Sequence, residues 1–329
     1  MGKYLIKRLL QSLFTIFLIV SVVFLLMRLM PKDYFFTEDE AMKLTEEQRV
    51  DRLTAAGLMD PPLVQLGRFW KDLVTKGDLG ISRRIATGKS VISVIGDKFG
   101  ISMELGLVAL ALSLVIGVPL GILQARYKDG IVDNVGTAYT IFVNAVPHLV
   151  SYSLIMIFGA RLLGLPTLFS NRKVWKFVLF GAQMKFNYST ILPILCLGMG
   201  STASYMLWMR RYMVDELNKD YIRLAKLKGL STSQVMFRHV MKNAFLPLAQ
   251  YLPYSILLTV GGSILVERFF SVPGLGPLMT DAISRYDINV VQAIVMLYAS
   301  LGILGVFLGD VLMTLLDPRI TLTGKESSR

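Results

Sequence analysis

The sequence predicts an all-α membrane protein with six transmembrane helices, and three observations lead to that fold class. Of its 329 residues, 53% are hydrophobic and only 18% are charged, whereas an average soluble domain carries roughly 25% charged residues. Six uncharged apolar runs meet or approach the roughly 20 residues that a helix needs to cross a bilayer. One cysteine and two histidines exclude a disulfide framework and leave little for a metal site.

The six apolar runs give the order in which the chain crosses the membrane. None of them carries the charges that the exposed face of a soluble helix shows. A shorter apolar piece, 177–184, lies between two lysines, and we interpret it as an interfacial or re-entrant segment. The runs are Leu9–Met27, Leu105–Leu123, Val135–Ala160, Phe186–Met209, Asn243–Val266 and Ile288–Gly309.

The first run has the basic start of a signal peptide, because Lys3, Lys7 and Arg8 precede it. Its apolar stretch is longer than the usual 7–15 residues of a signal peptide, and no small-residue cleavage site follows it. Arg28 and Pro31 close the run instead. We therefore expect a retained transmembrane helix.

Six crossings place both ends of the chain on one side of the membrane. With a cytoplasmic N-terminus, the inside segments hold 16 Lys and Arg residues and the short outside segments hold 7, in agreement with the positive-inside rule. The segment 31–100 exceeds the length to which that rule applies and is left out. The loop 161–185 opposes the rule, because it carries five basic residues and no acidic residue. Topology does not explain that loop.

The charge and hydropathy pattern divides the chain into four parts. We expect an N-terminal transmembrane helix at 1–30, an extracytoplasmic insert at 31–100, a membrane core at 101–316 with a cytoplasmic loop at 210–247, and a cytoplasmic tail at 317–329. In the insert, Thr45 followed by Gln48 is the pattern of a capping box, which starts a helix. The stretch 63–74 is typical of a short amphipathic helix. The insert is thus largely helical.

The cytoplasmic loop predicts two helices joined at a glycine. The first spans about 213–228 and is followed by Gly229, because helices commonly end at a glycine with left-handed backbone angles. The second spans about 232–245, with Ser231 as N-cap and Gln234 completing a capping box. Pro247 predicts a break or kink where the fifth crossing begins. We call residues 220–231 the elbow.

One face of the elbow has little side-chain bulk, because Ala225 and Gly229 are four residues apart. A partner protein can approach such a face closely, with apolar anchors and a charged rim beside it. An amphipathic loop that lies on lipid headgroups explains the same pattern. The spacing alone does not decide between the two. The anchors would be Tyr221 and Leu224, and the rim Arg223 and Lys226.

The elbow resembles a known motif. Asp-Tyr-Ile-Arg-Leu-Ala-Lys-Leu-Lys-Gly-Leu-Ser, from Asp220 to Ser231, is similar to the EAA loop of ABC-importer permeases in the dipeptide/oligopeptide permease family, where Glu is common at the position of Asp220. Lys32-Asp33-Tyr34 departs from the usual Gly-Asp-Pro of that family, and the loop 161–188 is longer and more basic. Val266–Gly276 is similar to the family's segment after the fifth crossing, and Asp310–Arg319 resembles its C-terminal signature. Lys3–Leu10 with Arg28–Pro31 resembles the N-terminus of the first of the two paired permeases.

The resemblance implies a type I ABC-importer permease fold and a transport subunit that performs no chemistry itself. A second, related permease would complete a path for oligopeptides or dipeptides. Two separate ATPase subunits would bind ATP and magnesium and grip the elbows, and an extracytoplasmic binding protein would deliver the peptide. The chain would need no cofactor and bind no nucleic acid. It would lie among the lipids of a bacterial or archaeal plasma membrane, with both termini cytoplasmic. The ATPase-coupling residues would be Asp220, Tyr221, Arg223, Leu224, Ala225, Lys226, Gly229, Leu230 and Ser231.

Polar groups and helix breakers at membrane depth predict a translocation path or gate. Pro147 bends the third run, small residues collect in the fourth, and a proline with two glycines makes a tight turn after the fifth. Plain helix packing also explains the residues of the third and fourth runs, and a simple connecting loop also explains the turn. The candidates are Asn144, Pro147, His148, Gly200, Ser201, Ser204, Glu267, Arg268, Pro273, Gly274 and Gly276.

Other functions remain as alternatives. An ion-coupled secondary transporter needs intramembrane carboxylates or broken helices in repeated halves, and the six runs are nearly free of acids. An intramembrane enzyme needs a nucleophile with a base, which His148 alone does not supply. A related permease for another solute, such as a nickel complex, shares the same motifs. Thr87-Gly88-Lys89-Ser90 is only half of a phosphate loop, because Arg83 stands where that motif needs glycine. We expect a polar turn there.

Overall fold

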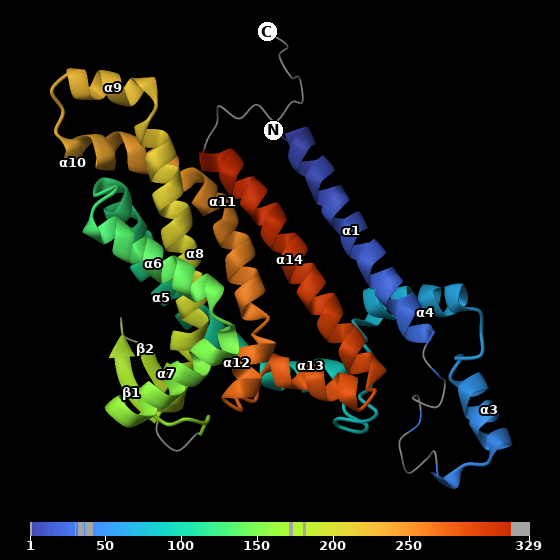
Figure 1. Ribbon diagram of the computed structural model, residues 1–329. Coiled ribbons are helices and arrows are strands. Elements are labelled where there is room, and N and C mark those ends of the chain that lie inside the picture. Colours follow the sequence, from blue (N-terminus) through green and yellow to red (C-terminus); the bar gives the residue numbers. More distant parts are fainter. Residues whose placement is uncertain are drawn as a thin grey trace.

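In the part of the chain that the structure describes, five helical segments are long and apolar enough to cross a membrane, and Figure 1 shows how they are arranged. The computed structural model describes residues 2–29, 31, 36, 42–170, 174–179 and 182–316, without the side chains of 2–4, 174–179 and 182–186. The five spans are Leu5–Arg28, Val91–Arg126, Tyr188–Leu217, Thr232–Phe269 and Ile288–Leu316. They contain the helices α1 (Gly2–Arg28), α5 (Val91–Arg126), α8 (Ile191–Leu217), α11 (Met241–Val260) and α14 (Ile288–Leu316).

The remaining predicted crossing is not one straight helix. Helices α6 (Ile131–Ala145) and α7 (His148–Leu163) meet at 113°. Pro147 caps the start of α7; because proline has no backbone N–H, it does not continue the hydrogen bonds of α6. The third run is therefore a bent pair of helices, either one broken span or a re-entrant loop, and the expected bend at Pro147 is confirmed. In Figure 1, α6 runs along the bundle and α7 lies across its lower end.

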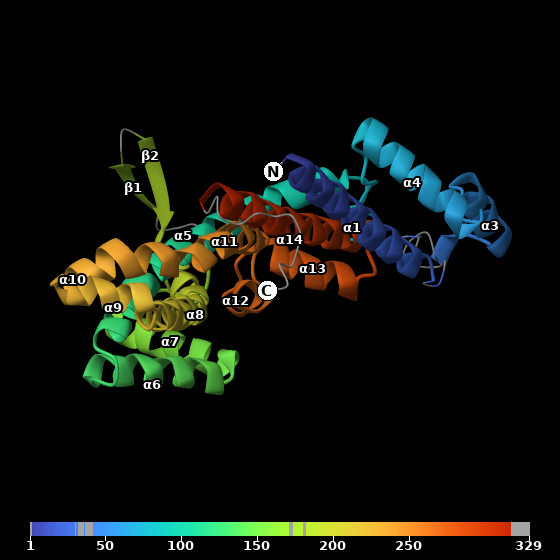
Figure 2. The ribbon, with the colours of Figure 1, turned by 90° about the horizontal axis from the view of Figure 1, so that it is seen from above.

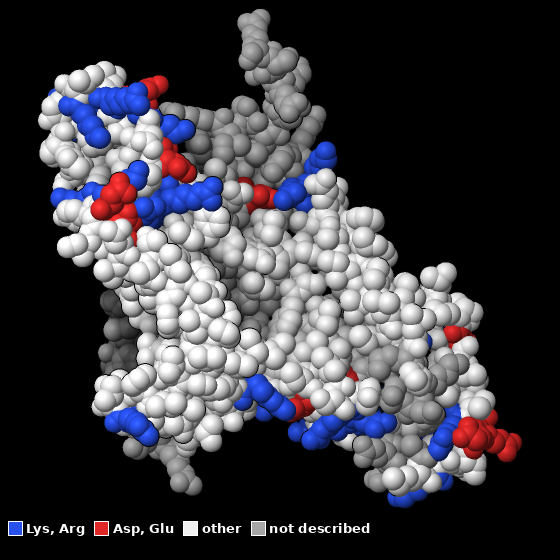
Figure 3. Space-filling view, in the orientation of Figure 1, with Lys and Arg blue, Asp and Glu red and all other residues white. Residues whose placement is uncertain are grey.

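The spans arrange the connecting segments on two sides (Figure 1). The start of α1, the end of α14 and the elbow lie on one side, which we call the elbow side. The insert, α7 and the turn after α11 lie on the opposite side. Charged side chains gather at both ends of the molecule, and the surface between them is almost free of charge (Figure 3). The uncharged band is the surface that a bilayer covers.

The insert contains the two predicted helices, α3 (Glu46–Ala55) and α4 (Pro62–Lys76). The capping box of Thr45 and Gln48 is present at the start of α3. Helix α4 packs against α1, where the rings of Trp70 and Phe17 lie 4.9 Å apart. The stretch 87–90 forms a turn, as expected, and Ser90 caps the start of α5.

A β-hairpin is the one described exception to an all-helical chain. Strands β1 (Val174–Leu179) and β2 (Ala182–Asn187) pair antiparallel, and the single 3-10 turn η2 (Tyr188–Thr190) leads into α8. Residues 177–179 and 182–184 of the piece interpreted as interfacial or re-entrant lie in these two strands, on the side opposite the elbow (Figure 1). Seen from above, the hairpin extends away from α6 (Figure 2). Arg172 and Lys173 of the basic loop, and the tail 317–329, lie outside the described residues.

Close helix packing in the core depends on glycines. A Cβ atom on Gly121 of α5 would lie 2.5 Å from the carbonyl oxygen of Met206 on α8, and one on Gly309 of α14 would lie 2.3 Å from that of Gln250 on α11. Apolar solvent gives helices little drive to associate, so small residues that allow close backbone contact stabilise membrane bundles. These contacts hold α8 against α5 and α11 against α14.

Candidate functional site

The helices of the elbow are shorter than the sequence predicts, and more breaks separate them. Helix α8 continues to Leu217, and α9 (Asp220–Leu227) begins after a break, so the predicted helix 213–228 is wrong. The second predicted helix is instead α10 (Thr232–Val235), a π turn η3 (Met236–Val240) and the start of α11, which passes through Pro247 without ending. The glycine joint is confirmed, because Gly229 has a φ of +83°. The capping box at Ser231 and Gln234 is also present.

Of the two small residues on the predicted docking face, Ala225 is covered within the chain and Gly229 is exposed. Ala225 is only 8% exposed and, with the fully buried Ile222, packs on Met209 and Met213 of α8. The expectation that Ala225 lies on the docking face is therefore wrong. The exposed apolar side chains of α9 are Leu224 at 54% and Leu227 at 85%. The other predicted coupling residues lie at the surface apart from the half-buried Leu230: Asp220, Tyr221, Arg223, Lys226, Gly229 and Ser231.

Polar contacts tie the elbow to both neighbouring spans. The hydroxyl of Tyr221 on α9 donates to the carboxylate of Glu216 near the end of α8. The amide of Asn243 on α11 donates to the same carboxylate at 3.1 Å and to the Tyr221 oxygen at 2.8 Å. Partial burial, followed by its bond to Glu216, raises the pKa of the Tyr221 phenol above its ordinary value, which keeps it a donor. The elbow is therefore bonded to both α8 and α11.

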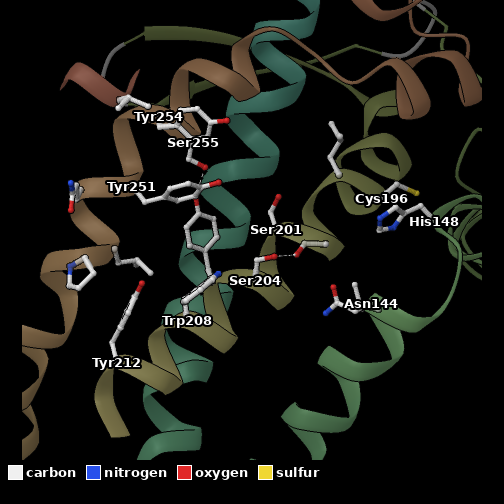
Figure 4. Close-up of a pocket in the computed structure, with 18 of the residues that line it drawn as sticks. Asn144, His148, Cys196, Ser201, Ser204, Trp208, Tyr212, Tyr251, Tyr254 and Ser255 are labelled. Atoms are coloured by element: carbon white, nitrogen blue, oxygen red, sulfur yellow. Dashed lines mark hydrogen bonds between the residues drawn. The ribbon is translucent and has the colours of Figure 1, made fainter. Parts of the chain in front are cut away.

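The same two helices line a cavity of about 1030 Å³ at membrane depth. Asn144 at the end of α6 and Tyr251 on α11 lie on opposite walls, with Ser201 and Ser204 of α8 between them (Figure 4). Five predicted path residues line it: Asn144, His148, Gly200, Ser201 and Ser204. Pro147 does not line it, but it sets the break between α6 and α7 that places Asn144 and His148 beside it.

Aromatic residues are the part of the cavity that sequence reasoning missed. Trp208 and Tyr212 of α8 stack with their ring centres 5.7 Å apart, and Tyr251 and Tyr254 of α11 lie 5.4 Å apart. Tyr205 also lines the cavity. The spacing of three and four residues within each run was the available signal, because it places these rings on one helix face. The wall thus combines ring faces with hydroxyl groups.

One carboxylate reaches the cavity near the elbow side. The Oδ2 atom of Asp310 on α14 accepts a bond of 2.5 Å from Arg8 of α1, and its Oδ1 atom accepts one of 3.3 Å from Gln250. Asp310 therefore forms an ion pair with Arg8. Its charge is compensated, so the cavity wall carries no strong field from this group.

The predicted residues after the fifth span form a separate structure. Helices α12 (Ile264–Phe269) and α13 (Leu275–Ser284) make a turn on the side opposite the elbow (Figure 1). The carboxylate of Glu267 is fully buried there and accepts bonds from the backbone N–H of Gly276 at 2.8 Å and of Ser263 at 3.2 Å. A Cβ on Gly274 would lie 2.4 Å from Glu267 Oε2. The glycines thus make room for the carboxylate.

None of these turn residues lines the central cavity among the described residues. Arg268 pairs with Asp281 of α13 at 2.7 Å. Pro273 precedes the start of α13, and Gly276 packs against Ile264 of α12. The structure therefore brings five of the eleven path candidates together and places Glu267, Arg268, Pro273, Gly274 and Gly276 in an outer turn.

The fold and this site define a membrane transport subunit: a helical bundle with a cavity at membrane depth and a rigid elbow outside the bilayer. Residues 117–322 match the model of the family described as binding-protein-dependent transport system inner membrane component. The chain belongs to this family, whose members are ABC-importer permease subunits without an ATPase site of their own.

Similar proteins agree along the whole chain. The dipeptide transport system permease protein DppB of Lactococcus lactis is 32% identical over 98% of this chain and 100% of its own length. The oligopeptide transport system permease protein AppB of Bacillus subtilis is 31% identical over 97% and 99%. The glutathione transport system permease protein GsiC of Pectobacterium atrosepticum is 31% identical over 97% and 99%. The inward-facing MetNI methionine ABC transporter shares the fold, with a TM-score of 0.53 at 15% identity over 69% of this chain and 97% of the other.

Proposed function

We propose that this chain is a permease subunit of an ATP-driven importer for dipeptides or oligopeptides, and that its central cavity is half of the path. The observation that carries the proposal is that α8 and α11 both line the cavity and hold the elbow. A partner that moves the elbow thereby moves two walls of the cavity. The alternating opening of a path requires such a linked pair of states.

The composition of the cavity wall supports a peptide substrate. Hydroxyl and amide groups of Ser201, Ser204 and Asn144 match the hydrogen-bonding groups of a peptide main chain. The rings of Trp208 and Tyr251 offer flat surfaces that accept many side chains. The names of the similar permeases, which include dipeptide, oligopeptide and glutathione transport, agree with this class of substrate.

The proposed assembly has three kinds of protein partner. A second, related permease covers the open side of the cavity, and two ATPase subunits that bind ATP and magnesium dock on the elbows. An extracytoplasmic binding protein delivers peptide to the side of α12 and α13. In this arrangement the elbow side is cytoplasmic, the chain spans a bacterial plasma membrane, and the basic start of α1 lies inside, in line with the positive-inside rule.

Transport by the assembled complex tests the proposal. Cells that express the chain with its partner genes should accumulate radiolabelled trialanine, and excess unlabelled dipeptide should compete whereas a nickel complex should not. Gly200→Trp should abolish uptake, because a Cβ on Gly200 meets no atom within 4 Å and the ring therefore extends into the cavity without a clash at its base. Gly100→Trp is the matched control, since Gly100 is equally open but lies outside the cavity. Uptake that survives Gly200→Trp, or competition by the nickel complex alone, would refute the proposal.

A further inference from the structure

A second hollow continues from the central cavity toward the elbow side. It has a volume of about 550 Å³, lies between α6 and α8, and shares Asn144 with the central cavity. Thr137 and Thr140 of α6 line it beyond Asn144, and Arg210 of α8 lies where it ends. We call this hollow the inner groove.

One side of helix α6 carries the polar side chains of Thr137 and Asn144, which line the inner groove together with the apolar Ile141 and Ala145. Val135 and Phe142, which do not line the groove, are 63% and 49% exposed. A polar stripe on a membrane-spanning helix is expensive next to lipid and therefore marks a water-filled cavity. Thr137 and Asn144 are seven residues apart, which is about 10 Å along a helix. That distance is close to the length of three residues of an extended chain.

Gln124 of α5 leaves an acceptor without a partner in this groove. The side chain is 2% exposed, and its Nε2 atom donates to the carbonyl oxygen of Asp133 at 3.2 Å. Its Oε1 atom is buried and has no hydrogen-bond partner in the described part of the chain. The absence of a side chain at Gly136 makes room for Gln124, because a Cβ there would lie 2.4 Å from Nε2. A buried amide oxygen without a partner is costly unless a donor arrives.

The charge at the end of the inner groove is compensated within the chain. Arg210 donates to both carboxylate oxygens of Asp133, at 2.5 and 2.7 Å. The groove therefore presents a few hydroxyl and amide groups among the apolar side chains of Ile141, Ala145 and Leu207, next to a neutralised ion pair. Such a surface binds the N–H and C=O groups that every residue of a peptide carries, and it does not select for side-chain charge.

We propose that the inner groove is the exit segment of the path, where an extended peptide binds through its main-chain amides on its way from the central cavity. This inference rests on the proposed function as a peptide importer. Thr137 and Asn144 bind successive main-chain groups, and the Gln124 oxygen accepts an N–H. The inner groove therefore does not select peptides by their side chains.

Cysteine accessibility tests whether the inner groove holds water. In a Cys196→Ala background, which removes the single cysteine of the chain, Thr137→Cys and Asn144→Cys should react with a charged, water-soluble thiol reagent in the assembled complex. Val135→Cys, on the lipid-facing side of the same helix, should react at least tenfold more slowly. Saturating trialanine should protect the first two positions. Equal rates at residues 135 and 137, or no protection by trialanine, would overturn the inference.

Uptake separates this inference from the proposed function. The double variant Thr137→Val and Asn144→Leu keeps the side-chain shapes but removes their hydrogen bonds, and we expect trialanine uptake to fall about tenfold or more, since each lost bond changes an equilibrium several-fold. Val135→Thr is the matched control and should leave uptake unchanged. Normal uptake by the double variant overturns the exit segment and leaves the peptide importer standing. Absence of peptide uptake by the wild-type complex refutes the proposed function and this inference with it, even where the groove reacts with the thiol reagent.

Discussion

The exposed leucines of α9 allow a quantitative prediction of how strongly an ATPase subunit depends on the elbow for binding. Leu227 is 85% exposed in the isolated chain and lies next to the glycine joint of the elbow. Full burial of a leucine side chain stabilises by about 1.5–3 kcal/mol, so docking of the exposed fraction contributes about 1.3–2.5 kcal/mol. Leu227→Ser should therefore raise the Kd for the ATPase subunit about 10- to 70-fold.

Binding of the purified ATPase to the permease pair, measured by surface plasmon resonance in detergent, checks this value. Leu29→Ser is the matched control, because Leu29 is similarly exposed, at 80%, but follows the end of α1 on the side opposite the elbow. The thermal unfolding temperature of both variants should equal that of the wild type, since neither side chain is packed in the chain itself. An unchanged Kd for Leu227→Ser would refute the docking face assigned to the elbow.

Three further predictions concern the scaffold, and thermal unfolding in detergent measures each of them. Ile222→Ala, under the elbow, should cost about 2–5 kcal/mol, because the side chain is fully buried; a stability equal to wild type would contradict the packing of α9 on α8. Gly276→Ala should cost about 1–3 kcal/mol, since its Cβ would lie 2.6 Å from the Ile264 Cα, and an increase in stability would show that the outer turn is loosely packed. Arg8→Gln should cost about 1–3 kcal/mol by leaving the Asp310 carboxylate without its cation, whereas no change would mean that the α1–α14 contact does not depend on this pair.

Local sequence signals predicted the features that neighbouring residues decide. The capping boxes at Thr45 and Ser231 are present, because a cap depends on side chains three residues apart. Gly229 has the expected left-handed backbone for the same reason. Pro147 breaks the third crossing because its ring removes a backbone donor wherever it stands.

Long-range packing explains what sequence reasoning missed. The spacing of Ala225 and Gly229 predicted that Ala225 lies on a docking face, but its side chain packs on Met209 and Met213 near the end of α8. The aromatic wall of the cavity joins Trp208 of α8 with Tyr251 of α11. Their proximity depends on how the two helices cross, and no local pattern contains that angle.

The sequence by itself determined the class of protein, since uncharged runs of sufficient length have no stable place except the bilayer. It also determined where the helices with capping boxes begin, that Pro147 breaks the third run, and that the elbow turns at a glycine. Only the tertiary structure decided which face of each helix meets water, protein or lipid, because that choice depends on contacts between residues such as Arg8 and Asp310, 302 positions apart. The cavity, the outer turn around Glu267 and the inner groove are all products of that choice.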